Sequence, residues 1–279
     1  MMHPSNVVSA KSRIILLGHK DPAKQIDLDA GEGPFESWLA VAQDIWGEGN
    51  LTPFDNVFTA TAIGALAVTG KAIFGAVCHH LGSRLFSFSR EIDIWIDAYE
   101  GEQSVSQTQK RPKDKVKLSL WKVGSRQLGT KRFTKLAALQ VSRLQTGIDS
   151  FSRDCAGSLK AEGNLFLADL MKGSGGTSVP LSVRHGNVEL RSLEDHRNAL
   201  TSAGLVLHNE YDLTSDVQGA IRKGLFNSIK VLTNIRMLKE PWRKQRLAAY
   251  YRELELVCEL YNGLENGGLV AAGIVAVKP

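Results

Sequence analysis

Residues 71–100 constrain the fold more than any other stretch of the chain. They read as an apolar strand over about 72–77, a tight turn, a helix, and a second apolar strand followed by the carboxylate of Glu100. This order is that of the first half of a nucleotide-binding βαβ unit. A turn that holds a cofactor should be glycine-rich, but this turn contains one glycine, Gly82, where three are expected. The sequence therefore predicts the frame of a nucleotide site with an altered lining.

Strands and helices alternate along the chain, which predicts an α/β fold. Strands are expected at 72–77, 92–99, 116–121, 133–139, 164–170, 205–211 and 269–277. Helices are expected at about 81–90, 142–159 and 192–203, with two long helices before the last strand. Ser192 and Asp195 have the spacing of an approximate capping box. We predict a Rossmann-like, doubly wound, mainly parallel seven-stranded sheet.

The chain is expected to contain three regions. Residues 1–33 lack a periodic pattern, and glycine and proline follow the acidic residues near their end, which indicates an N-terminal arm. Residues 34–69 carry two patterns of helical spacing and are interpreted as a helical cap. Residues 70–279 form the Rossmann-like domain, with a helical insertion at about 213–264.

Composition narrows the function classes. The formal net charge is +5 and the pI about 9.1, a milder imbalance than that of a dedicated nucleic-acid binder. The three cysteines are far apart and form no CxxC pair, which disfavours a disulfide framework or a structural zinc site. No segment approaches the roughly 18 apolar residues of a membrane span, and the apolar run 14–17 is too short for a signal-peptide core. We expect a cytoplasmic protein with reduced thiols.

Four phrases, in their order along the chain, resemble those of class I S-adenosylmethionine-dependent methyltransferases of the bacterial small-molecule and lipid type. They are WGEGNLTP at 46–53, SLKAEGNLFLAD at 158–169, LTSAGL at 200–205 and GGLVAAGIVAVKP at 267–279. The resemblance covers residues 38–279. It implies the fold of this family, S-adenosylmethionine as the cofactor, and methyl transfer to a small-molecule or lipid-like acceptor.

The resemblance also implies positions for the cofactor site. The family's first strand ends on an acidic residue followed by Gly-x-Gly-x-Gly, because glycine lets the backbone lie against the ligand. In this chain the acidic position falls on Ala76, and the three glycine positions fall on Cys78, His80 and Gly82. The acidic residue that holds the ribose hydroxyls falls on Glu100. One glycine of three and one of the two main carboxylates are therefore kept.

Residues 78–80, Cys-His-His, invite a metal or nucleophile interpretation. A structural zinc site needs about four ligands, and no second Cys/His pair stands at a useful spacing, so we predict no metal site. Methyl transfer depends on the alignment of donor and acceptor more than on an acid or base, and no catalytic residue is assigned. Asp169 is interpreted as a cap or turn residue.

Two function classes stay open. The first is an enzyme that methylates a small-molecule or lipid-like acceptor held under the helical cap. The second is a catalytically degenerate homologue, a pseudoenzyme that acts as a scaffold or regulatory subunit. A protein partner or a second copy of the chain could contact the C-terminal helices in either case. Nucleic acid is disfavoured as a partner, because no target-recognition module or base-flipping motif is present.

Two basic clusters remain outside these interpretations. The first, from Lys110 to Lys117 and continuing to Arg132, could face nucleic acid or an anionic membrane, but a solvated surface is favoured because stacking aromatics are few. The second joins the two C-terminal helices and consists of Arg236, Lys239, Arg243, Lys244 and Arg246.

Overall fold

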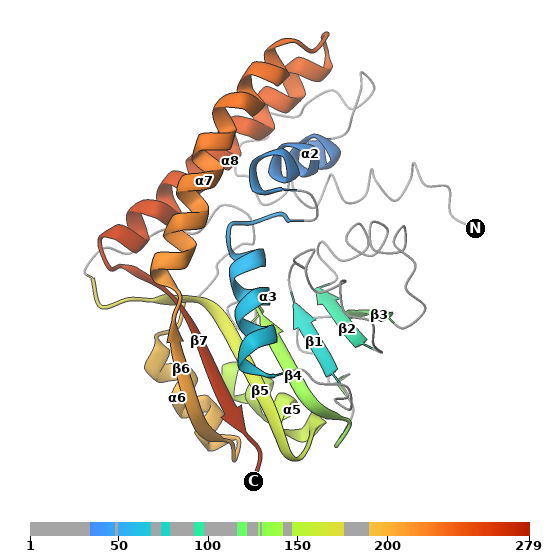
Figure 1. Ribbon diagram of the computed structural model, residues 1–279, viewed down its shortest axis with the longest axis vertical. Helices are drawn as coiled ribbons and strands as arrows, with labels where there is room; N and C mark the ends of the chain where they lie inside the picture. Colours follow the sequence, from blue (N-terminus) through green and yellow to red (C-terminus); the bar gives the residue numbers. More distant parts are fainter. Residues whose placement is uncertain are drawn as a thin grey trace.

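The computed structural model describes residues 34–47, 50–67, 74–78, 92–97, 116–121, 128, 130–141, 147–175 and 190–279. Seven strands form one sheet in the order β3-β2-β1-β4-β5-β7-β6, as Figure 1 shows. The β7 strand is antiparallel to both of its neighbours, and the other strand pairs are parallel. The predicted α/β class with a Rossmann-like sheet is confirmed.

The elements have the following bounds along the chain. The strands are β1 Phe74–Cys78, β2 Ile92–Asp97, β3 Val116–Trp121, β4 Phe133–Leu139, β5 Leu159–Lys172, β6 Val206–Asp212 and β7 Leu269–Val277. The helices are α2 Pro34–Trp46, α3 Phe54–Ala65, α5 Ile148–Ser158, α6 Leu193–Ser202, α7 Thr214–Arg236 and α8 Trp242–Glu265. The bounds predicted for β3 and β4 agree with these, as do those for β7. The helix expected at 81–90 and the arm at 1–33 lie outside the described residues.

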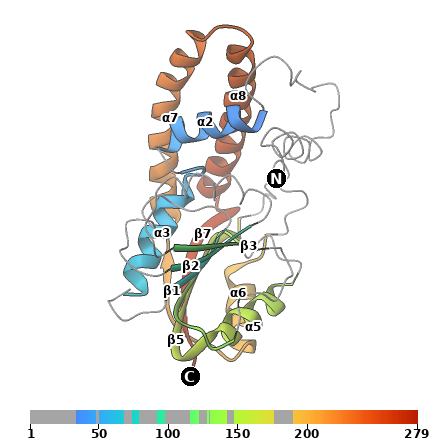
Figure 2. The ribbon, with the colours of Figure 1, turned by 90° about the vertical axis from the view of Figure 1, so that its right-hand side faces the viewer.

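Helices cover both faces of the sheet (Figure 2). On one face, α3 and the sheet-proximal halves of α7 and α8 pack against alternate residues of β5, including Phe166 and Leu170. On the other face, α5 and α6 pack against the intervening residues, including Leu165 and Leu167. Because the β5 side chains on both faces are buried, this strand reads as a continuous apolar run, as central strands of α/β sheets do.

The start of β5 differs from the prediction. The sequence predicts that a helix ends at residues 160–163 and that the strand begins at 164, but β5 begins at Leu159. Glu162 adopts a positive φ of 60°, and the pairing with β4 shifts register in this segment, so an irregular stretch extends the strand. Its backbone is held by the chain end, because Glu162 N donates to Lys278 O at 2.8 Å and Lys278 N donates to Gly163 O at 2.9 Å. Residues 160–163 have the composition of a loop, but their backbone is hydrogen-bonded to Lys278, and the composition does not indicate this pairing.

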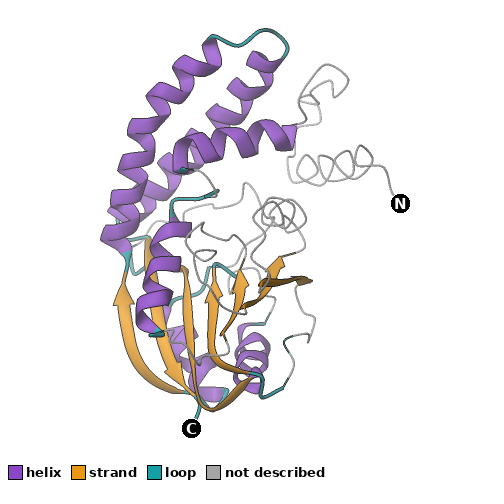
Figure 3. Cartoon of the chain, turned by 45° about the vertical axis from the view of Figure 1, so that its right-hand side comes forward, coloured by secondary structure: helices purple, strands orange, loops and turns teal. Residues whose placement is uncertain are grey.

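The two helices that were grouped as a cap lie in different places. The α3 helix packs on the sheet, since Phe58, Ala62 and Leu66 share a buried cluster with strand residues such as Ala137. The α2 helix instead packs on the sheet-distal halves of α7 and α8 (Figure 3). The residues buried in this contact are Trp38, Val41, Ala42, Ile45, Leu51, Val231, Ile235, Ala249 and Tyr250.

The contact between α2 and α7 depends on one glycine. A Cβ atom at Gly224 would lie 2.6 Å from Trp46 Cε3, inside van der Waals contact, whereas a Cβ at Gly219 on the same helix would meet nothing within 4 Å. We expect Gly224→Ala to lower the free energy of unfolding by about 1–3 kcal/mol, as overpacking does. Gly219→Ala should raise it by about 0.5–1 kcal/mol, because alanine favours the helix. Urea unfolding of both variants checks this, and equal effects of the two substitutions would contradict it.

Candidate functional site

The carboxyl ends of the parallel strands meet at one edge of the sheet, where β1 lies between β2 and β4. The chain turns to one side of β1 to form β2 and β3, and to the other side to form β4 and β5, so the β1–β4 pair is the point at which the strand order reverses. Ligands of doubly wound sheets bind in the crevice at such a point. Cys78 of β1 pairs in register with Leu139 of β4, which places both strand ends at this candidate site.

A buried polar network stands at the end of β4. The Asp55 carboxylate of α3 accepts from the backbone N–H groups of Leu51 and Thr52 at 2.6 and 3.0 Å through Oδ2. Its Oδ1 accepts from Thr52 Oγ1 and from Gln140 Nε2, each at 2.7 Å. Asp55 and Gln140 are both 1% exposed. The network therefore joins the start of α3 to the residue that follows β4.

Gln140 turns the chain away from the sheet at the edge. Its φ is 59°, in the left-handed region, and its backbone N–H donates to Ala168 O of β5 at 2.9 Å. A non-glycine residue in this region costs free energy and persists only where the surroundings hold it. Here the hydrogen bonds from Gln140 to Ala168 and Asp55 stabilise this backbone conformation. Beside Asp55, the buried Asn56 Oδ1 has no hydrogen-bond partner among the described residues.

The residues predicted to hold a cofactor are placed only in part. Ala76 is buried within β1, and β1 continues to Cys78, so the first predicted glycine position is the last residue of the strand. His80, Gly82 and Glu100 lie outside the described part of the chain. The assignment of Cys78, His80, Gly82 and Glu100 to a cofactor site therefore stays a prediction.

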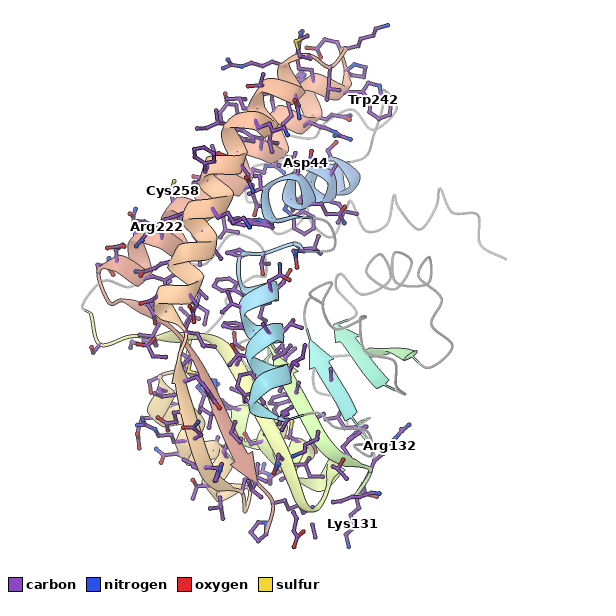
Figure 4. The ribbon with its side chains drawn as sticks, viewed as in Figure 1. Asp44, Lys131, Arg132, Arg222, Trp242 and Cys258 are labelled. Atoms are coloured by element: carbon purple, nitrogen blue, oxygen red, sulfur yellow. The ribbon has the colours of Figure 1, made fainter. Side chains whose placement is uncertain are left out.

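Beyond the sheet edge, a buried carboxylate connects α2 to α8. Trp38 Nε1 and Trp46 Nε1 each donate to Glu253, one to each carboxylate oxygen, at 2.9 Å. Glu253 is 1% exposed. Also between α2 and α8, partial burial raises the pKa of Asp44, an effect that the nearby Arg246 guanidinium opposes. Figure 4 shows Asp44 on α2.

No local pattern in the sequence indicates these networks beyond the residue types themselves. Gln140 and Asp55 are 85 positions apart, and Trp38 and Glu253 are 215 positions apart. Two tryptophans eight residues apart are consistent with one helical face, but their spacing does not identify a partner carboxylate.

The interpretation of Asp169 as a cap or turn residue is wrong. Asp169 lies inside β5, is fully buried, and pairs in register with Ala272 of β7. Its Oδ1 accepts from the backbone N–H of Leu170 at 2.8 Å. The buried His196 of α6 interacts electrostatically with it, and burial lowers the pKa of His196 below its ordinary value. This polar pair lies on the α6 face of the sheet, away from α3.

Two kinds of feature are absent from the described segments of the chain. Those segments contain no group of three or more His, Cys, Asp or Glu side chains arranged to hold a metal ion. Their helices also include none with the length and hydropathy required to cross a membrane.

Comparisons with known proteins identify the fold. No protein-family model matches the chain, and no curated protein matches it. Among solved structures, a phosphoethanolamine N-methyltransferase 2 from Haemonchus contortus, in complex with phosphomonomethylethanolamine and S-adenosylhomocysteine, superposes with a TM-score of 0.69 at 11% identity. The match covers 88% of this chain and 57% of that one, so this chain spans little more than half of that enzyme's length.

Two further structures match over nearly their whole lengths. A cyclopropane synthase from Mycobacterium tuberculosis gives a TM-score of 0.66 at 8% identity, covering 87% of this chain and 94% of that one. A geranyl diphosphate C-methyltransferase from Streptomyces coelicolor, with Mg²⁺, geranyl diphosphate and S-adenosyl-L-homocysteine, gives 0.62 at 12% identity, covering all of both chains. The chain has the class I S-adenosylmethionine-dependent methyltransferase fold.

Proposed function

We propose that this protein transfers a methyl group from S-adenosylmethionine to a small-molecule or lipid-like acceptor. The observation that carries the proposal is the reversal of strand order between β1 and β4, with both strands ending at the same edge of the sheet. That edge is where this architecture binds nucleotides. The solved structures of the same fold include complexes with S-adenosylmethionine or S-adenosylhomocysteine.

The cofactor would lie at the carboxyl ends of β1 and β2. Gly82 and Glu100 are the two positions at which the family pattern is kept. The backbone of Gly82 would contact the cofactor, and the carboxylate of Glu100 would bind its ribose hydroxyls. Cys78 and His80 would line the same turn. Ala76 stands at the family's acidic position, is buried and has no carboxylate. Binding of the cofactor at this turn would therefore depend on backbone contacts and on Glu100. When bound, the cofactor supplies an electrophilic methyl group.

The acceptor would lie between the sheet edge and the helices beyond it. Four helices would border this region. The start of α3 is held to the residue after β4 through Asp55 and Gln140, α2 is held to α8 through Glu253, and α7 lies beside α8. We propose that residues 34–46 and 213–264 act together as the acceptor cover, and that α3 belongs to the cofactor-binding domain. Solved structures with this fold contain molecules as different as phosphomonomethylethanolamine and geranyl diphosphate, so the cover would determine the acceptor.

A second candidate function is a scaffold or regulatory subunit without methyl transfer. The observation that favours it is the position of Cys78, a residue with a side chain at the end of β1 where the family pattern has glycine. Glycine at this position of the family pattern lets the backbone approach the ligand, and in this hypothesis a residue other than glycine would prevent that approach. In this case the sheet edge would be closed, and a partner protein or a second copy would use the C-terminal helices.

A titration distinguishes these two functions. We expect S-adenosylmethionine and S-adenosylhomocysteine to bind the purified full-length chain, measured by calorimetry. Glu100→Ala should weaken binding by about 10- to 100-fold, because loss of a charged hydrogen-bonding partner of two hydroxyls costs about 1.5–3 kcal/mol. Glu102→Ala, two residues further on, is the matched control and should leave the affinity unchanged.

Each outcome of the titration selects one function. Binding that depends on Glu100 excludes the closed scaffold. Absence of binding by wild type, together with tight binding by a Cys78→Gly/His80→Gly variant, would show that the two side chains block the site and would overturn the proposed methyl transfer.

A further inference from the structure

The turn between α7 and α8 forms the end of the molecule farthest from the sheet (Figure 1). The α7 helix begins at the carboxyl edge directly after β6, and its 23 residues span about 35 Å at 1.5 Å per residue. The α8 helix returns along it to β7. We call residues 236–246, which end α7, form the turn and begin α8, the hairpin tip.

Two large apolar side chains are exposed at the hairpin tip. Met237 is 84% exposed and Trp242 is 45% exposed. Figure 4 shows Trp242 at this end of the hairpin. Single exposed apolar residues are ordinary on a protein surface, but these two flank one short turn. Tryptophan at such a position is typical of a membrane–water interface, where its ring contacts apolar atoms and its N–H stays hydrated.

The same residues carry a concentrated positive charge. The hairpin tip contains five basic residues and one acidic residue, a net charge of +4, against +5 for the whole chain. Glu240 pairs with Arg243 at 3.1 Å, and Arg246 interacts with Asp44 of α2. Arg236, Lys239 and Lys244 are exposed around the turn. Glu240 and Asp44 thus each have an arginine beside them, and the three exposed cations are directed to solvent.

From this combination we infer that the hairpin tip docks on an anionic lipid surface, with Met237 and Trp242 inserted among the headgroups and the basic residues contacting lipid phosphates. Each basic residue near such a surface contributes about 1 kcal/mol of attraction, and apolar insertion adds to it. A nucleic-acid surface fits less well, because a flexible methionine and a single aromatic ring do not make a stacking platform. The inference is independent of the proposed methyl transfer, since docking requires no cofactor.

Vesicle binding tests the inference. We expect the full-length chain to co-sediment with vesicles of phosphatidylcholine and phosphatidylglycerol, but only weakly with vesicles of phosphatidylcholine alone. Raising the salt concentration should reduce the binding, because salt screens the charges. Lys239→Glu/Lys244→Glu should weaken it by about 30-fold or more, the effect of losing two basic contacts. The matched control is Lys223→Glu/Lys230→Glu, which makes the same charge change on exposed positions of α7 nearer the sheet and should bind within about threefold of wild type.

The apolar contribution is tested separately. Met237→Ser/Trp242→Ala should weaken binding by about tenfold or more, whereas Phe226→Ser, which removes a 78% exposed side chain elsewhere on α7, should have no effect. Trp242 fluorescence should shift to shorter wavelength on vesicle addition, and the shift should be missing in Trp242→Phe. Circular dichroism checks that each variant is folded.

Three results would overturn the inference. These are equal binding to neutral and anionic vesicles, equal loss of binding in the tip variants and their controls, and tighter binding to a DNA or RNA oligonucleotide than to anionic vesicles. Loss of methyl transfer without loss of vesicle binding would leave the inference intact, and the converse result would leave the proposed activity intact.

Discussion

Asp55→Ala should lower the free energy of unfolding by about 3–5 kcal/mol, because four donors would lose a common acceptor in a buried site. Two of these donors are the backbone N–H groups of Leu51 and Thr52, and the others belong to the side chains of Thr52 and Gln140. A buried donor without a partner costs more than its hydrogen bond contributes when made. Urea unfolding followed by circular dichroism measures the change.

Asp55→Asn is the matched comparison for this substitution. The amide oxygen can still accept from the two backbone N–H groups, and its NH₂ can face Gln140 and Thr52 if the Gln140 amide flips and the Thr52 hydroxyl rotates. The asparagine variant should therefore lose only about 1–2 kcal/mol. Asp216→Ala, at an exposed position in the first turn of α7, should change the free energy by no more than about 1 kcal/mol. Equal effects of alanine and asparagine at position 55 would contradict the buried network.

Glu253→Ala should produce a loss of similar size by a different route. The substitution removes the Glu253 acceptor from the indole N–H groups of Trp38 and Trp46, beside a buried apolar cluster. At about 1–3 kcal/mol for each buried unpaired donor, with an added cavity, we expect a loss of about 3–5 kcal/mol. Because both donors belong to α2, that helix should detach first. Limited proteolysis would then cut near α2 before the sheet domain unfolds.

The control for Glu253 lies two residues along the same helix. Glu255 is exposed, and Glu255→Ala should change the free energy of unfolding by less than about 0.5 kcal/mol. The loss of unfolding free energy in Glu253→Gln should lie between those of Glu253→Ala and Glu255→Ala, since the glutamine amide oxygen can accept from one indole. A Glu253→Ala variant that unfolds within 1 kcal/mol of wild type, with α2 still protected from protease, would refute this role of the carboxylate.

The fold was predictable because its main elements carry local patterns. The apolar runs that became β4 and β7 end at polar or terminal residues, and their predicted bounds agree with the structure. The Ser192–Asp195 capping box is confirmed: Asp195 N donates to Ser192 Oγ, and Ser192 N donates to Asp195 Oδ2. Such signals act over three or four residues, so they can be read from the sequence directly.

The candidate site was less predictable because its contacts join distant segments. Nothing near Asp55 indicates a partner 85 residues away, and the φ of Gln140 follows from that contact and from its bond to Ala168. Asp169 was misread for a related reason. A carboxylate after four apolar residues is typical of a strand end, but pairing with β7 continues β5 to Lys172. The conformation and environment of these residues are set by contacts with distant segments of the fold rather than by their neighbours in sequence.

The hairpin of α7 and α8 leaves the sheet and returns to it at one place. Leu213 N donates to Ala271 O at 2.8 Å, so the residue that precedes α7 is bonded directly to the strand that follows α8. Adding one turn to each helix would therefore lengthen the hairpin by about 5.4 Å without changing the register of any strand. The height of the helical hairpin can vary in evolution or design in whole helical turns while the carboxyl edge of the sheet keeps its geometry. If the hairpin covers the acceptor as proposed, one sheet can in this way be fitted to acceptors of different length.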